Sequence, residues 1–238
     1  NVIRENRADG TILLRSAEPL SEVDGTTGDW LHRWAKEAPD RTFIAERHGA
    51  GWREENYGET LEKVRAIASS LLGRGMGPDT PLLIMSGNGV DHGLLALAAQ
   101  YVGIPTVPVA EQYSLIHGAH GRLRHAIELV RPRMAYVVDA TQYSEALALD
   151  VLDDIEVIAT RADAQTTPFA DLLKGDCADV DVARAKVGPD SVVKLLMTSG
   201  STSSPKAVMT THRMMCTNQV QLADAMPFLR ARHPHNLL

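Results

Sequence analysis

The chain has 238 residues, of which 44% are hydrophobic, so it is long enough and apolar enough to bury a sizeable core. A formal net charge of -6 without a basic cluster argues against nucleic acid as a partner. The two cysteines, Cys177 and Cys216, indicate reduced thiols, and no apolar run approaches the ~18 residues of a membrane span. We therefore expect a cytoplasmic protein with no membrane span.

The two ends of the chain differ from its middle. Residues 1–26 are polar and predict an irregular arm lying over the domain, in which only Ile12, Leu13 and Leu14 could form a buried or edge segment. The chain starts at Asn1 and stops at Leu238 within an apolar approach, from which we expect a fragment of a longer protein.

Helical and strand periodicities follow in turn. Apolar residues from Thr27 recur at helical spacing until Pro39, and residues 42–45 and 52–57 predict a hairpin through a Gly-Ala-Gly turn. Residues 61–72 then predict an amphipathic helix that ends at two glycines.

The next hundred residues alternate between strands and helices. A strand at 81–85, a helix at 90–101 and a strand at 106–109 make a parallel βαβ unit. The second alternation has the same pattern, with predicted elements at 123–130, 134–138, 143–149 and 155–159. The fold expected is α/β, with a doubly wound, largely parallel sheet flanked by helices.

Three further patterns are weak signals of function. The glycines at 73–77 and 87–89 lack the context of a dinucleotide-binding turn, so we interpret both as ordinary turns. The spacing of His117, His120 and His125 fits no common zinc pattern and favours scattered surface histidines. The acidic residues between 150 and 190 could hold a metal ion, but they favour a solvated connecting segment.

The most informative stretch is residues 195–212, where a strand stops at a loop rich in small hydroxyl residues. Six Ser or Thr side chains and Gly200 lie between Thr198 and Ser204, followed by Pro205 and Lys206. Short hydroxyl and backbone N–H donors held close together, with one mobile positive charge, suit phosphate oxygens. A second strand at 207–210 follows, and Thr211 can cap a helix that begins with His212.

This loop has two rival interpretations. A Ser/Thr/Gly/Pro cluster is often only a surface loop, but here a strand lies on each side of it. A Walker-type loop requires Gly-Lys-Ser/Thr, whereas Lys206 lies between Pro205 and Ala207.

The segment from Thr198 to Val208, TSGSTSSPKAV, resembles the phosphate loop of the adenylate-forming superfamily, which includes acyl-CoA synthetases, peptide-synthetase adenylation domains and luciferases. Nine of eleven positions fit the pattern Thr-Ser-Gly-Ser/Thr-Thr-Gly-x-Pro-Lys-Gly-Val, and Ser203 and Ala207 replace its two other glycines. Residues 27–219, with segments such as TGDWLHRWAKEAPDRTFIAER and MTTHRMMCTNQ, are similar to feruloyl-CoA synthetase-type enzymes.

The resemblance implies an AMP-forming ligase. ATP with Mg²⁺ would activate an aromatic, hydroxycinnamate-like acid to an acyl-adenylate, and coenzyme A would then accept the acyl group. It implies an arm and helix over residues 1–40 and the N-terminal α/β subdomain of an AMP-binding domain, incomplete at its C-terminal end, over 41–238. The family's phosphate-contacting positions correspond to Thr198, Ser199, Gly200, Ser201, Thr202 and Lys206.

Other implications concern the metal, the missing motifs and the alternatives. Thr198 is also the candidate Mg²⁺ contact, and His212 matches a family histidine that either packs and caps or reaches the nucleotide. The later family motifs are absent, including the adenylation lysine, so this segment supplies no catalytic residue of its own and we expect it to be inactive alone. The alternatives are an adenylation domain serving a carrier protein and a non-catalytic anion-binding module.

Overall fold

A largely parallel sheet forms the centre of the molecule. The computed structural model describes residues 2–198 and 205–230. Within these residues one sheet has seven strands in the order β11-β10-β6-β5-β7-β8-β9, and only the β10–β11 pair is antiparallel. The strands are β5 (Leu82–Ile84), β6 (Thr106–Pro108), β7 (Met134–Asp139), β8 (Glu156–Arg161), β9 (Thr167–Pro168), β10 (Val192–Thr198) and β11 (Lys206–Thr211). The predicted α/β fold is confirmed.

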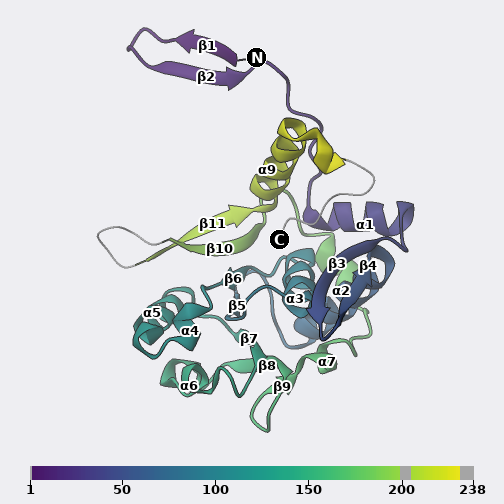
Figure 1. Cartoon of the computed structure of the whole chain (residues 1–238), viewed down its shortest axis with the longest axis vertical. Coiled ribbons are helices and arrows are strands. Elements are labelled where there is room, and N and C mark those ends of the chain that lie inside the picture. Colours follow the sequence, from purple (N-terminus) through teal and green to yellow (C-terminus); the bar gives the residue numbers. More distant parts are fainter. Residues whose placement is uncertain (1, 199–204, 231–238) are drawn as a thin grey trace.

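Helices cover both faces of this sheet because successive strand side chains point to opposite sides. In β5, Leu82 and Ile84 belong to one buried cluster with α2 (Tyr57–Gly73) and α3 (Val90–Tyr101). Leu83 belongs to a second cluster with α5 (His120–Val130) and α6 (Ser144–Leu147). All three β5 side chains are fully buried. Figure 1 shows the sheet between these two groups of helices.

The first helix and the hairpin that follows it form as predicted. Helix α1 (Thr27–Glu37) begins with a capping box in which Thr26 and Asp29 bond each other's backbone N–H groups, and Leu31 packs into the cluster that contains α2 and α3. Strands β3 (Thr42–His48) and β4 (Gly51–Asn56) form the antiparallel hairpin. Asn56 then caps α2.

The N-terminal arm differs from its prediction. Residues 2–16 form a two-stranded antiparallel hairpin of β1 (Val2–Asn6) and β2 (Ile12–Ser16), turned at Gly10, whose φ is +83°. Nearly all its side chains are exposed, and Figure 1 shows it projecting from the rest of the chain instead of lying over the domain. Each cross-strand pair joins an apolar to a polar residue, as Ile3 with Arg15 and Leu14 with Arg4, so neither segment shows the pattern of a buried strand.

The acidic segment between residues 150 and 190 also differs from its prediction. It contains β9 and two short helices, α7 (Phe169–Leu172) and α8 (Val180–Arg184), which place three side chains in the core. Its carboxylates remain at the surface, where Asp181 pairs with Arg65 of α2 at 2.6 Å. The acidic residues lie on the outer face of this segment, and its few apolar residues pack against α2 on the inner face.

The remaining elements are short, apart from one helix after β11. They are α4 (Gln112–Leu115), η1 (His117–Ala119), η2 (Asp150–Leu152), α9 (His212–Ala225) and η3 (Pro227–Arg230). The helix predicted at 143–149 is thus shorter than expected and ends before η2. Across residues 2–198 and 205–230, every helix is too short or too polar to span a lipid bilayer.

Candidate functional site

The candidate site lies at the edge of the sheet where the parallel strands end. Strand β10 runs parallel to β6, β6 runs parallel to β5, and β5 runs parallel to β7. The carboxyl ends of these four strands therefore meet at one edge of the sheet. Ligands of open α/β sheets bind at this edge. The candidate phosphate loop leaves β10 there and returns as β11.

Two of the predicted site residues are brought together by this strand pair. Thr198 ends β10, Lys206 begins β11, and the two are direct cross-strand partners. The Thr198 hydroxyl donates a hydrogen bond to the Lys206 carbonyl oxygen at 3.2 Å, and Lys206 itself is exposed. The other four predicted phosphate contacts, Ser199, Gly200, Ser201 and Thr202, lie outside the described residues.

The surroundings of Thr198 can be tested against a divalent cation. Its hydroxyl proton is donated to Lys206, so lone pairs of a hard oxygen remain for a magnesium ion. Among the residues that the structure describes, no group of three or more His, Cys, Asp or Glu side chains could hold a metal ion. Thr198 Oγ1 is thus the one ligand atom that the sequence prediction assigns to a Mg²⁺ ion, and its lone pairs fit that role.

The three histidines have different hydrogen-bond partners, although the rings of His117 and His120 lie edge to face with centroids 5.7 Å apart. His117 pairs with Glu145 at 3.2 Å, and His120 contacts the Ser114 carbonyl at 3.1 Å. His125 instead reaches the carbonyl oxygen of Pro205, the residue before Lys206, at 2.8 Å. The metal interpretation stays unsupported, but His125 is a neighbour of the candidate loop that sequence reasoning missed. No local signal could have found it, since 80 positions separate the two partners.

Two other polar groups line the same edge of the sheet. Tyr143, which follows β7, donates from its hydroxyl to the Glu111 carboxylate at 2.5 Å, and Glu111 follows β6. Burial, with the carboxylate beside it, raises the pKa of Tyr143, so this hydroxyl stays a neutral donor. Gly87, after β5, leaves room for Glu111, because a Cβ there would lie 3.0 Å from Glu111 Oε2.

His212 is placed by its helix in the interior. As the first residue of α9 it is fully buried, and its Nδ1 accepts a hydrogen bond from the backbone N–H of Thr27 at 3.2 Å. That N–H is one of the unpaired donors at the start of α1, so His212 satisfies a helix terminus. Of the two roles considered from the sequence, packing and capping describe this environment.

The titration of His212 should make stability depend on pH. Burial lowers its pKa below the ordinary 6.5, with the Gln100 carbonyl and Asp29 opposing the shift. Below pH 6.5 the unfolded chain binds a proton that the folded chain does not, so stability is complete above that pH and declines as the pH falls. We expect the thermal midpoint to fall between pH 7 and 5 less steeply in His212→Gln than in the unsubstituted protein.

A matched substitution tests that assignment. His117 is exposed, so His117→Gln should leave the pH dependence unchanged. Burial also lowers the pKa of His32, so this histidine accounts for the pH dependence of the thermal midpoint that remains in His212→Gln. Equal slopes in His212→Gln and in the unsubstituted protein would contradict the assignment.

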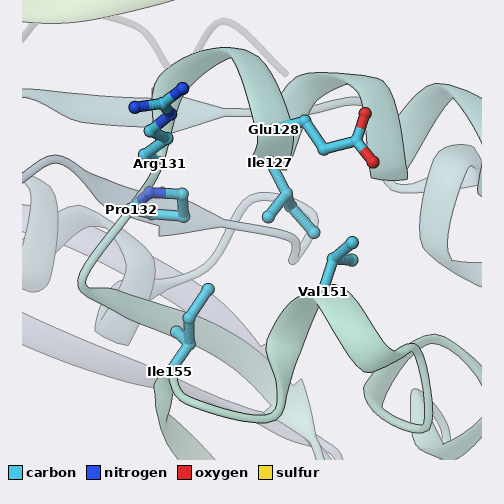
Figure 2. Close-up of a pocket in the computed structure, with 6 residues that line it drawn as sticks. All are labelled: Ile127, Glu128, Arg131, Pro132, Val151 and Ile155. Carbon is cyan, nitrogen blue, oxygen red and sulfur yellow. The ribbon is translucent and has the colours of Figure 1, made fainter.

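A separate pocket lies away from this edge of the sheet. A pocket of about 390 Å³ is lined by Ile127, Glu128, Arg131, Pro132, Val151 and Ile155. Figure 2 shows Ile127 and Val151 pointing toward each other across it. Pro132 and Ile155 precede β7 and β8, so this apolar pocket lies at the amino edge of the sheet, opposite the Thr198–Lys206 pair.

Known proteins are similar to this chain in sequence and fold. The family model described as AMP-binding enzyme matches residues 31–234. The chain is 27% identical over 218 residues to 4-coumarate–CoA ligase 2 of Oryza sativa subsp. japonica, covering 86% of this chain and 38% of that protein. It is 26% identical over 198 residues to phenyloxazoline synthase MbtB of Mycolicibacterium paratuberculosis, covering 83% and 14%.

Solved structures show the same fold at lower identity. A fatty acyl-adenylate ligase from L. pneumophila, in complex with acyl adenylate and pyrophosphate, superimposes with a TM-score of 0.67 at 17% identity, over 85% of this chain and 33% of that chain. VinN in complex with L-aspartate superimposes with a TM-score of 0.65 at 24% identity, and the match covers 88% of this chain and 54% of that chain. The chain thus spans less than two thirds of the length of each of these four proteins.

Proposed function

The chain belongs to the AMP-binding enzyme family, and we propose that it carries the ATP-phosphate loop of an enzyme that activates a carboxylic acid as its acyl-adenylate. The observation that carries this proposal is the Thr198–Lys206 pair. Thr198, whose hydroxyl donates to the Lys206 carbonyl, and the exposed Lys206 are cross-strand partners at the carboxyl edge of the parallel strands, within the segment that matches the family.

The chemistry proposed requires stabilisation of phosphate charge. An acid carboxylate attacks the α-phosphorus of ATP, its new P–O bond replaces the bond to pyrophosphate, and pyrophosphate leaves with the electron pair. In the second step the thiol of coenzyme A attacks the acyl carbon and AMP leaves. Lys206 supplies a compact positive charge that can follow the phosphates, and the hydroxyl and N–H groups of Ser199, Gly200, Ser201 and Thr202 supply donors. A Mg²⁺ ion bound with the nucleotide would be held in part by Thr198 and would supply further positive charge.

The organisation and the substrate are also proposals. Residues 41–238 form the N-terminal α/β part of an AMP-binding domain, and residues 1–40 supply an arm and a helix before it. Similarity to a 4-coumarate–CoA ligase supports an aromatic, hydroxycinnamate-like acid and coenzyme A as the acceptor. Because the chain spans only 38% of that ligase, we expect this segment alone to be inactive.

A second candidate function has support of its own. The phenyloxazoline synthase MbtB and the Apicidin F synthase of Gibberella fujikuroi match the chain at nearly the same identity as the ligase. An adenylation domain would perform the same first step and pass the acyl group to a phosphopantetheine carrier. The two candidates differ in the acceptor and share the candidate loop.

Pyrophosphate release by the full-length protein tests both candidates. A panel of hydroxycinnamates, benzoates, fatty acids and amino acids, each supplied with ATP and Mg²⁺, should show release with the aromatic acids above the others. Adding coenzyme A should then yield a thioester. Release that requires an amino acid, with transfer only to a carrier protein, would favour the adenylation domain. No release with any acid, together with no binding of ATP, would contradict the proposal and favour a non-catalytic module.

A further inference from the structure

His125 makes the one described side-chain contact to the backbone just before Lys206. Its Nε2 lies 2.8 Å from the Pro205 carbonyl oxygen. A carbonyl only accepts hydrogen bonds, so Nε2 carries the hydrogen and the ring donates. Proline has no N–H, so this carbonyl is the only backbone group through which residue 205 can be held by a hydrogen bond.

The contact completes a pair of restraints around Lys206. On one side the Pro205 carbonyl is bound by His125, and on the other the Lys206 carbonyl accepts from the Thr198 hydroxyl at 3.2 Å. The two peptide groups that flank the lysine Cα are therefore each tied to a different element, α5 and β10. Together they set where the lysine side chain leaves the backbone.

Helix α5 is a rigid support for this contact. Leu123, Ala126 and Ile127 of α5 are buried in the second core cluster, against strand residues such as Leu83. His125 lies on a different face of the helix, at helical spacing from the exposed Gly121 and Glu128, and it is half-buried. α5 also contacts β11, so the helical layer reaches the edge pair of the sheet.

We propose that His125 is a positioning residue for ATP, which holds the Pro205–Lys206 backbone so that the lysine ammonium meets the phosphates. This inference rests on the proposed function, since it assumes that Lys206 binds nucleotide phosphate. It adds a residue from a distant helix to a site whose other predicted members lie in the loop.

The test is ATP binding and turnover in the full-length protein with three substitutions. His125→Phe keeps an aromatic ring without a donor, and His125→Gln keeps an N–H at a similar reach. His120→Phe is the control, since His120 also contacts a carbonyl from α5, but that of Ser114 in α4. Mg²⁺-ATP binding is measured by calorimetry, and KM for ATP and for the acid by pyrophosphate release.

The expected pattern separates positioning from folding. The loss of one hydrogen bond that leaves a carbonyl unpaired should weaken Mg²⁺-ATP binding and raise KM for ATP about five- to tenfold in His125→Phe. In His125→Phe, KM for the acid and the thermal midpoint of unfolding should change little. His125→Gln should bind ATP about as tightly as the unsubstituted protein. His120→Phe should also bind ATP normally.

Other outcomes overturn the inference. ATP binding in His125→Phe within about twofold of the unsubstituted protein, or an equal rise in both KM values, would show that the contact is structural only. If the unsubstituted protein binds ATP but releases no pyrophosphate with any acid, the proposed function fails while the binding series still decides the role of His125. If it binds no ATP, both are wrong.

Discussion

Replacing Lys206 with alanine should lower the rate of pyrophosphate release about 10²- to 10³-fold, the loss expected when one charged or hydrogen-bonding group that stabilises transition-state charge is removed. The substitution should fold normally, because the side chain is exposed at the start of β11 and the hydrogen bond from the Thr198 hydroxyl goes to the backbone carbonyl of residue 206. Initial rates at saturating acid and ATP, together with ATP binding by calorimetry, provide the measurement.

Matched variants define what that result means. Lys206→Arg keeps the charge but replaces a compact ammonium group with a planar guanidinium group. Its rate of pyrophosphate release should therefore lie between those of Lys206→Ala and the unsubstituted protein. Lys186→Ala removes an exposed lysine elsewhere and should leave the rate unchanged. A rate for Lys206→Ala close to that of the unsubstituted protein would mean that the lysine does not meet the phosphates. Absence of ATP binding in both proteins would favour a phosphate loop that has lost its function.

Replacing Gly175 with alanine should destabilise the fold by about 1–3 kcal/mol or more, the range for forcing extra atoms into a packed site. An added Cβ would lie 2.1 Å from the carbonyl oxygen of Ala66 in α2 and 2.9 Å from the Cβ of Ser69. The nearest atom belongs to the backbone of a buried helix, so relief requires the segment after α7 to move away from α2. Equilibrium unfolding in urea measures the change.

A second glycine provides the control. Gly121 lies in the first turn of α5, and nothing would come within 4 Å of an added Cβ there. Gly121→Ala should therefore raise the free energy of unfolding by about 0.4–1 kcal/mol, because alanine restricts the unfolded chain. Equal effects of the two substitutions would show that the segment around residue 175 does not pack against α2 as described.

The sequence by itself determined most elements of the central sheet and its helices, and it predicted the chemistry of the loop. The alternation of buried strands with helices predicted the parallel sheet, and strand patterns on both sides of the hydroxyl-rich segment predicted that β10 and β11 would present Thr198 and Lys206 together. These signals are local, because they depend on hydrophobic periodicity, turn residues and side-chain type within a few positions. The paired strands of residues 2–16 were missed because their side chains are exposed, and an exposed hairpin leaves no pattern of burial.

Only the tertiary structure decided which distant residues meet. His125 reaches Pro205 across 80 positions, His212 reaches Thr27 across 185, and Gly175 packs on α2 inside a segment whose charges indicated only a solvated surface. The pattern of side chains along a chain records which of them leave water, but not which surfaces pack against each other. That choice depends on the summed fit of helices onto a sheet, so the contacts that hold the backbone around Lys206 appear only once the layers are assembled.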